Sequence, residues 1–309
     1  MSSTLLLACL SLLAASAAAA SAPPPPMKAV VAGGYEPSIN ATVIDKWLTN
    51  KARPRAGRKQ LLIRINTSSV NPCDVDLITS KPEAEAAKLF RKTLGFDVSG
   101  VVVAAGADCA RIKVGDAVWS DLGEFGLREG IAEMGAWAQY AVADEEQAGL
   151  APTSLSLEQA GTLPLVGLTS LESLQLAGAP WPAAAKKSVV VTSGQGGTGI
   201  TGVQLAKALG ATRVVTACDA AHLKFCRELG ADSVVDFRQT TIFAGLKDNS
   251  VDVVYDNFGS KGNADAAMRV LRPGGFFIAV QGSLSGHPKA GVTQKKVDLR
   301  YKDPCCEFQ

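Results

Sequence analysis

The chain has 309 residues, of which 47% are hydrophobic and 19% charged, and its formal net charge at pH 7 is +2. This length suffices for about two domains with well-formed cores, and the absence of a block of basic residues argues against nucleic-acid binding. The two histidines, His222 and His287, disfavour histidine-based metal clusters and Ser-His-Asp catalysis, and the seven cysteines show no C-x-x-C spacing.

Residues 1–22 are typical of a cleavable targeting leader. An apolar run at residues 5–13 precedes small residues at 20–22 that resemble a cleavage site, and the prolines at 23–26 form a linker. We expect a secretory signal peptide, with no stable membrane span after its removal because the run is short. A bipartite leader would instead address the chain to a complex plastid, and a disordered Ala/Pro segment is the plain alternative.

Residues 27–150 predict a β-rich first domain. Its short apolar runs are broken by Gly and Pro, and they lie at residues 30–35, 61–65, 101–103, 113–118 and 136–142. This pattern is typical of a small barrel. Helical patterns between residues 157 and 171 then lead into a second domain, so we predict the boundary near residue 150.

Residues 151–284 predict a doubly wound α/β domain. A buried strand at 189–191 precedes a glycine turn and an apolar-periodic helix at 200–209. Further strands and helices alternate along the chain, and they lie at residues 213–217, 223–229, 233–236, 253–257 and 275–282. Such a β-α-β-α-β series predicts a parallel sheet.

The glycine turn is the candidate cofactor site. Gly194, Gly196 and Gly199 have the G-x-G-x-x-G spacing that lets backbone approach a pyrophosphate, and Gly197 and Thr198 complete the turn. The helix that follows would present N–H groups and its positive dipole to the same phosphates. Because the motif stands between a strand and a helix, it indicates a dinucleotide site. A Rossmann-like domain with another use is the alternative.

Five motifs also follow one another in a recognisable order. They are SVNPCD at 69–74, GFDVSGVV at 95–102, VGDAV at 114–118, LPLVGLT at 163–169 and GQGGTG at 194–199. Together they resemble the medium-chain dehydrogenase/reductase superfamily, in its zinc-free quinone oxidoreductase and enoyl reductase branch, over about residues 27–294. The resemblance implies a GroES-like β-barrel domain beside a Rossmann domain, an active site in the cleft, and a homodimer.

The same resemblance bears on zinc. Zinc members of the superfamily place a cysteine ligand where this chain has Asn71 and a histidine where it has Phe96. Phenylalanine has no lone pair and one amide does not hold Zn²⁺ against water, so we expect no metal. Cys73, two residues past the ligand position, is expected to be a structural or reactive thiol. Without a Lewis acid, hydride addition to an activated double bond is favoured over alcohol oxidation; a zinc alcohol dehydrogenase with unconventional ligands is a third hypothesis.

The end of the second Rossmann strand bears on cofactor choice. NAD-selective sites usually carry an acid there, whereas the family's spacing puts Ala217 at that position, and alanine leaves room for a 2′-phosphate. His222 stands where related NADPH enzymes often have a lysine, with Lys224 two residues on. Asp219 is the counter-evidence, because a carboxylate displaced along the loop would pair with the ribose and repel a phosphate; the alternative is that Asp219 is a solvated loop acid. We expect NADPH rather than NADH, with His222 alternatively a plain surface residue.

Three residues are catalytic candidates by resemblance. In relatives, the asparagine matching Asn71 lies near the nicotinamide, where its amide orients the ring or donates to developing oxyanion charge. Asp97 would stand at the cleft where zinc enzymes have glutamate, and Thr169 beside the nicotinamide ribose. The alternative for each is local capping of a turn, helix or strand. No general acid is evident, and solvent would then deliver the proton.

These expectations define an NADPH-dependent reductase that transfers a hydride to an enone or 2-alkenal, or to a quinone, without zinc. The alternative is a non-catalytic NADPH-binding regulator or scaffold. The feature that favours this alternative is the segment 285–309. In the family the sequence normally returns to the first domain here, whereas in this chain the segment is short and polar. We predict a divergent tail there, without that return.

Overall fold

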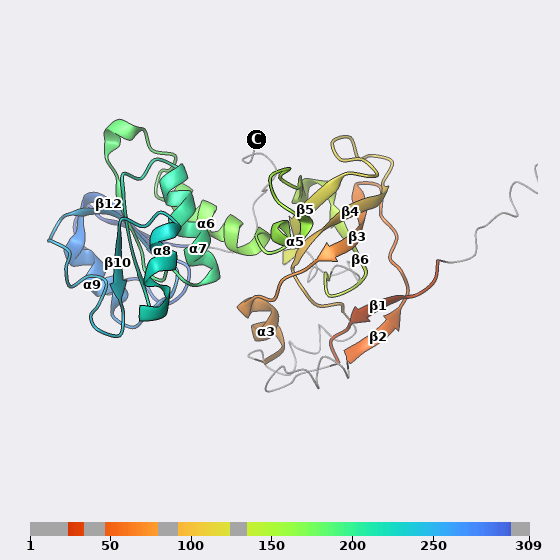
Figure 1. Ribbon diagram of the computed structural model, residues 1–309, viewed down its shortest axis with the longest axis horizontal. Helices are drawn as coiled ribbons and strands as arrows, with labels where there is room; N and C mark the ends of the chain where they lie inside the picture. The colour runs from red at the N-terminus through yellow and green to blue at the C-terminus, as the bar shows by residue number, and fades with distance from the viewer. Residues whose placement is uncertain (1–23, 34–46, 80–91, 124–134, 298–309) are drawn as a thin grey trace, which may run out of the picture.

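The structure is a computed structural model that describes residues 24–33, 47–79, 92–123 and 135–297. The predicted leader and the last residues of the predicted tail lie outside these ranges. Two sheets form separate halves of the molecule, and helices α5 (Leu157–Ala160) and α6 (Pro164–Leu176) lie between them (Figure 1). Within the described ranges, no helix is both long and apolar enough to cross a membrane.

The first half is built on a curled antiparallel sheet with the strand order β6-β3-β4-β5-β7. Its strands are β3 (Gln60–Thr67), β4 (Asp97–Ala105), β5 (Ala117–Asp121), β6 (Tyr140–Asp144) and β7 (Ala148–Leu150). Leu61 and Ile63 of β3 and Val98 and Val102 of β4 alternate into one core, as strand periodicity requires. The hairpin β1 (Met27–Val30) and β2 (Leu48–Lys51) lies below this sheet in Figure 1, with helix α3 (Pro72–Thr79).

The second half is a parallel sheet with the order β10-β9-β8-β11-β12-β13. Its strands are β8 (Ser188–Val191), β9 (Arg213–Cys218), β10 (Ser233–Asp236), β11 (Val251–Asp256), β12 (Leu271–Ala279) and β13 (Thr293–Lys296). Numbered from β8, this order is 3-2-1-4-5-6, which is the doubly wound arrangement of dinucleotide-binding domains. The fold class predicted from the sequence is confirmed.

Two hydrophobic cores cover the faces of this parallel sheet. Val189 and Val191 of β8 pack with α6 and α7 (Gly197–Ala208), while Val190 packs on the other face with α9 (Asn263–Val270). Helix α8 (Leu223–Glu228) follows β9. A central strand buried on both faces reads as a continuous apolar run, which is why the sequence predicted it correctly.

The far edge of the sheet differs from the prediction. β13 pairs in parallel with β12, whereas the sequence placed residues 285–309 in a tail. The sequence Thr-Gln-Lys-Lys is polar, and lysines on an edge strand discourage further strand pairing. β12 also begins at Leu271, earlier than expected, and its register against β11 shifts before Val253. Neither the strand β13 nor the early start of β12 has an alternation of apolar and polar residues from which sequence analysis could predict it.

Candidate active site

The first turn of α6 lies between the two halves. The Leu165 N–H donates to Asp97 Oδ1 of β4 at 2.8 Å. The next carbonyl, that of Val166, accepts from Thr201 Oγ1 of α7 at 3.0 Å. A Cβ added to Gly197 would lie 2.9 Å from Val166 Cγ1. One short helical segment therefore contacts both the β4 carboxyl group and the glycine turn.

Asp97 lies at the centre of a hydrogen-bonded group. The Asn71 Nδ2 amide donates to Asp97 Oδ2 and to Ser69 Oγ, each at 2.9 Å, and the Ser69 hydroxyl donates to Asp97 Oδ2 at 2.5 Å. Asp97 has 0% exposure and Asn71 has 5%. Burial raises the pKa of Asp97, and the hydrogen bonds from Ser69 and Asn71 oppose this rise. The structure thus brings the two predicted residues into direct contact, with Ser69 as an unanticipated third partner.

Two further buried carboxyl groups surround Asp97. Asp121 stands directly opposite Asp97 across the β4–β5 pair, and Asp74 accepts from the Asn71 N–H at 2.7 Å. Burial, with a smaller contribution from the charge of Asp97, raises the pKa of Asp74 and that of Asp121 to about 7 each. Like charges directly opposite one another destabilise a sheet. The group therefore retains a proton near neutral pH.

This set of side chains does not suit Zn²⁺. Asn71 turns its amide nitrogen, which has no free lone pair, toward Ser69 and Asp97. Burial and the neighbouring Asp74 raise the pKa of the Cys73 thiol, so the thiolate that zinc requires is disfavoured. Across the described ranges, no three His, Cys, Asp or Glu side chains are grouped to hold a metal ion.

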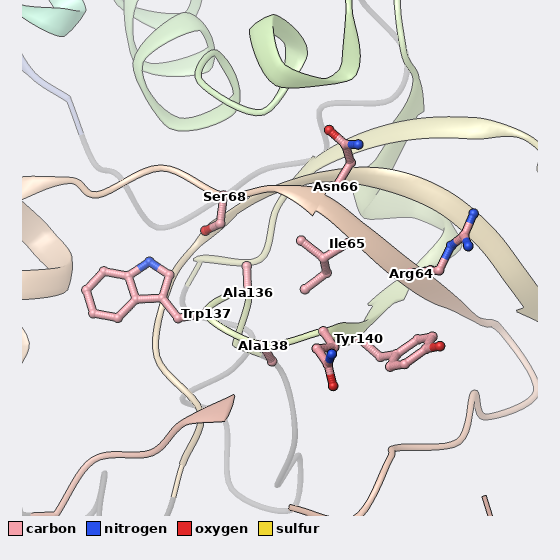
Figure 2. Close-up of a pocket in the computed structure, with 9 residues that line it drawn as sticks. Arg64, Ile65, Asn66, Ser68, Ala136, Trp137, Ala138 and Tyr140 are labelled. Atoms are coloured by element: carbon pink, nitrogen blue, oxygen red, sulfur yellow. The ribbon is translucent and has the colours of Figure 1, made fainter. Parts of the chain in front are cut away.

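A hollow of about 470 Å³ lies beside the Ser69 loop. Trp137 forms one wall and donates its Nε1–H to the Ser69 carbonyl at 2.9 Å. Figure 2 shows Trp137 and Ser68 at one end and Arg64 and Tyr140 at the other. The Tyr140 ring is covered by Arg53, whose guanidinium carbon is 4.0 Å from the ring centroid. The hollow thus offers aromatic surface beside the Ser69 backbone.

The three glycines of the motif differ in the space around them: an added Cβ would clash at two of them and meet open space at the third. A Cβ on Gly194 would lie 2.6 Å from Thr216 Oγ1, and one on Gly199 would overlap the Ser193 carbonyl oxygen. At Gly196 the nearest atom would be Ser193 Oγ, 3.8 Å away. Gly196 is also the N-cap of α7 and provides no side-chain cap. This turn fits a dinucleotide, because its surface at Gly196 stays open beside the N-terminus of a 12-residue helix.

Asn257 holds the glycine turn in place. Its Nδ2 donates to the Ser193 carbonyl (2.9 Å) and to Thr198 Oγ1 (3.2 Å), and its Oδ1 accepts from the Ser193 N–H (3.0 Å) and Thr192 Oγ1 (3.1 Å). It follows β11, the strand beside β8 where the strand order reverses. Sequence analysis missed this residue, although a polar side chain directly after the fourth strand stands where ligands bind in such sheets.

Thr169 and its neighbour have different surroundings. Thr169, on α6, is 4% exposed, and its carbonyl accepts from Ser173 Oγ at 2.6 Å. The adjacent Ser170 hydroxyl donates to the Thr198 carbonyl at 2.9 Å and lies 3.1 Å from the Tyr255 hydroxyl. Thr169 therefore lies on α6, the helix beside the glycine turn, and its neighbour Ser170 makes the hydrogen bond to that turn.

The end of β9 differs in detail from the expected arrangement. Ala217 is 3% exposed and packs in the core on the α9 side, so its side chain does not reach the rim of the turn. Asp219 follows β9 and accepts from Gln195 Nε2 of the glycine turn at 3.2 Å, and its Oδ1 lies 2.6 Å from His222 Nδ1. Hydrogen bonding to His222 lowers the pKa of Asp219. Lys224 is directed to Glu228, 3.6 Å away.

Comparison with family models gives two matches. Residues 57–153 match the alcohol dehydrogenase GroES-like domain, and residues 197–302 match a domain described as zinc-binding dehydrogenase. The first contains Asn71, Asp97 and the hollow, and the second begins inside the glycine turn. The two halves of the chain thus match consecutive domains of one class of dehydrogenase.

Individual relatives are reductases. A 2-methylene-furan-3-one reductase of Solanum lycopersicum is 34% identical over 77% of this chain and 58% of its own length. An NADPH-dependent alkenal/one oxidoreductase of Arabidopsis thaliana, named as chloroplastic, is 33% identical over 77% of this chain and 59% of its own length. The solved quinone oxidoreductase of Coxiella burnetii aligns with a TM-score of 0.69 at 25% identity, over 87% of this chain and 82% of that one. The chain thus spans somewhat more than half the length of these curated relatives.

Proposed function

Because the chain belongs to the medium-chain dehydrogenase/reductase superfamily, in its quinone oxidoreductase and enoyl reductase branch, we propose that it is an NADPH-dependent reductase. Its acceptors are the activated double bond of an enone or 2-alkenal, or a quinone, and it works without zinc. The names of the tomato and Arabidopsis relatives support this acceptor class.

The observation that carries the proposal is the contact of α6 with both candidate subsites. Leu165 binds Asp97, which holds Asn71, while Val166 touches Gly197 of the turn. The glycine turn would hold the pyrophosphate of the cofactor. Asn71, whose amide is fixed by hydrogen bonds to Ser69 and Asp97, would help to orient the nicotinamide or the acceptor.

In this reaction the residues of the chain bind and orient the cofactor and the acceptor. The nicotinamide, when bound, supplies the hydride. Backbone N–H groups at the start of α7 hold the phosphates, and Asn257 keeps the turn in its binding shape. The Trp137 wall of the hollow would receive a flat acceptor by stacking.

The test follows the absorbance of NADPH with the purified chain, a quinone and a short 2-alkenal offered in parallel, and NADH as the comparison. We expect NADPH to be oxidised faster than NADH, and only when an acceptor is present. NADPH binding, seen by fluorescence titration, with no oxidation by either acceptor would instead identify a binding protein without turnover.

The chloroplastic relative supports the plastid alternative for the leader, and a fluorescent fusion of residues 1–26 in an algal cell would separate plastid from secretory delivery.

We expect Asp219→Asn to strengthen NADPH binding about fivefold, the equivalent of roughly 1 kcal/mol. The carboxylate that repels a 2′-phosphate disappears, and the His222 ring is released from its contact with Asp219. NADH binding should weaken, because the amide is a poorer acceptor for the ribose hydroxyls. Dissociation constants for both cofactors provide the measurement.

Asp248→Asn is the matched control, because it makes the same charge change at an exposed residue that pairs with Arg269. Neither dissociation constant should change in this variant. Weaker NADPH binding in Asp219→Asn would show that the carboxylate supports the turn through Gln195 more than it opposes the phosphate.

A further inference from the structure

The hollow beside the Ser69 backbone has two chemically different ends. At one end Trp137 and Ser68 provide an indole ring and a small hydroxyl group, and at the other end Arg64 and Tyr140 line the wall (Figure 2). Among the described residues that line it, none is an aspartate or a glutamate. The charge that this lining carries is therefore the positive charge of Arg64.

Arg64 is an exposed residue of β3. Within the part of the chain that the structure describes, its guanidinium makes no ion pair or hydrogen bond, whereas the guanidinium of Arg58 pairs with Asp108 at 2.6 Å. A guanidinium offers two parallel N–H donors, which match the two oxygens of a carboxylate. No described side chain takes up this donor pair, so it is available to a ligand.

A second arginine adds positive charge at the same end. The Arg53 guanidinium carbon lies 4.0 Å from the centroid of the Tyr140 ring, and Tyr140 stands directly opposite Arg64 across the β3–β6 pair. The cation–π contact holds Arg53 beside the hollow without neutralising its charge. Two guanidinium groups near one concave surface attract anionic ligands to it.

Resting on the proposed function, we propose that the hollow binds acceptors with a carboxylate at the far end of an apolar chain, so that the substrates are unsaturated oxo-acids. The reacting enone or enal lies against Trp137, whose indole donates to the Ser69 carbonyl at 2.9 Å and so adjoins the loop that carries Asn71. The chain of the acceptor passes Ile65, which lies between the two ends in Figure 2. The carboxylate binds the Arg64 guanidinium.

The length of the hollow sets the length of the acceptor. Ser68 directly follows β3, and Arg64 lies within that strand. The separation between these two residues is about 13 Å at about 3.3 Å per strand residue. A chain of roughly ten carbon–carbon bonds spans this distance. A short oxo-acid reaches only the Trp137 end, so its carboxylate should give no advantage over the corresponding ester.

A matched pair of acceptors tests the subsite. The pair consists of a long-chain enone with a terminal carboxylate and the methyl ester of the same compound, and NADPH oxidation gives the KM for each. We expect the KM of the acid to be about tenfold lower, the contribution of one charge-assisted hydrogen-bonded pair. The ratio should shrink as added salt screens the charges. Equal KM values for acid and ester at low salt overturn the proposal.

Substitution of Arg64 tests the assigned residue. Arg64→Gln should raise the KM of the acid until acid and ester have the same KM. Arg64→Lys keeps the charge but not the paired donors, so it should give an intermediate ratio. Arg213→Gln is the matched control, because it removes an exposed arginine at the start of β9 in the other half, and it should keep the wild-type ratio. A wild-type ratio in Arg64→Gln would overturn the proposal.

Calorimetry with a saturated oxo-acid, which has no activated double bond, gives a measurement without turnover. The saturated acid should bind the wild type more tightly than its methyl ester, and Arg64→Gln should remove this difference. If NADPH is oxidised but the saturated acid and ester bind equally, the subsite is wrong and the proposed function stands. If the acid binds through Arg64 but neither unsaturated acceptor supports NADPH oxidation, the proposed function fails, and the acceptor role of the acid fails with it.

Discussion

Gly196→Ala should leave the free energy of unfolding within about 1 kcal/mol of the wild type and yet raise the dissociation constant for NADPH at least about 100-fold. The backbone at Gly196 has φ −78° and ψ 164°, which any residue adopts, and an added Cβ meets no atom nearer than Ser193 Oγ at 3.8 Å. The methyl group would instead occupy the open surface where the pyrophosphate must approach the backbone.

Gly199→Ala, in contrast, should lower the free energy of unfolding. Its Cβ would overlap the Ser193 carbonyl oxygen and lie 2.8 Å from the carbonyl carbon. Backbone cannot yield as a flexible side chain does, so we expect a loss of about 3 kcal/mol or more in unfolding free energy, together with loss of NADPH binding. Urea unfolding and fluorescence titration measure the two quantities. Gly245→Ala, with no neighbouring atom within 4 Å of its Cβ, is the control; equal behaviour of Gly196→Ala and Gly199→Ala would contradict the assignment of the open position.

Asp121→Asn should stabilise the fold at pH 8 by up to roughly 4 kcal/mol and stabilise it less at pH 5. The ordinary pKa of Asp121 is 3.8, and burial, aided by the charge of Asp97, raises it to about 7 in the folded chain. Between these values the folded chain binds more protons than the unfolded one, so the free energy of unfolding falls as the pH rises from about 4 to about 7. Asparagine cannot ionise and removes this loss, while its side-chain oxygen can still accept from the Gly123 N–H.

Urea unfolding of both proteins at pH 5 and pH 8 provides the measurement. Asp116→Asn is the control, since Asp116 stands in the turn before the same strand and accepts from the Lys113 N–H. Its effect should not depend on pH in this way. A destabilisation by Asp121→Asn at pH 8 would mean that the ionised carboxylate has a favourable partner.

The elements that the sequence predicted well are those with a clear hydrophobic period. β8, β9 and β10 begin and end within a residue of expectation, because each has a valine pair or run between turn residues. β13 was missed because an edge strand of Thr-Gln-Lys-Lys has no such period. Ala217 was placed at the cofactor rim by spacing along the chain, yet the alternation of β9 turns its side chain into the core and leaves Asp219 at the rim.

Part of the candidate site was predicted from the family resemblance rather than from hydrophobic periodicity. Asn71 and Asp97 came from resemblance, and the structure supplies their contact. Asp121 could not be found in this way, because its position opposite Asp97 depends on the register of two strands, which local sequence does not determine. Ser69 was passed over because a serine before an asparagine and a proline reads as an ordinary turn residue.

The contact between Leu165 and Asp97 restricts how this chain can be recombined with its relatives. Residue 150 ends the last strand of the first sheet and looks like a natural crossover point for a chimaera. However, Asp97 lies before that point and its backbone donor, Leu165, lies after it. The hydrogen bond from Ser99 Oγ to the Leu157 carbonyl crosses the same point. A chimaera joined there would inherit the Asp97 carboxyl group from one parent and the helix whose backbone binds it from the other.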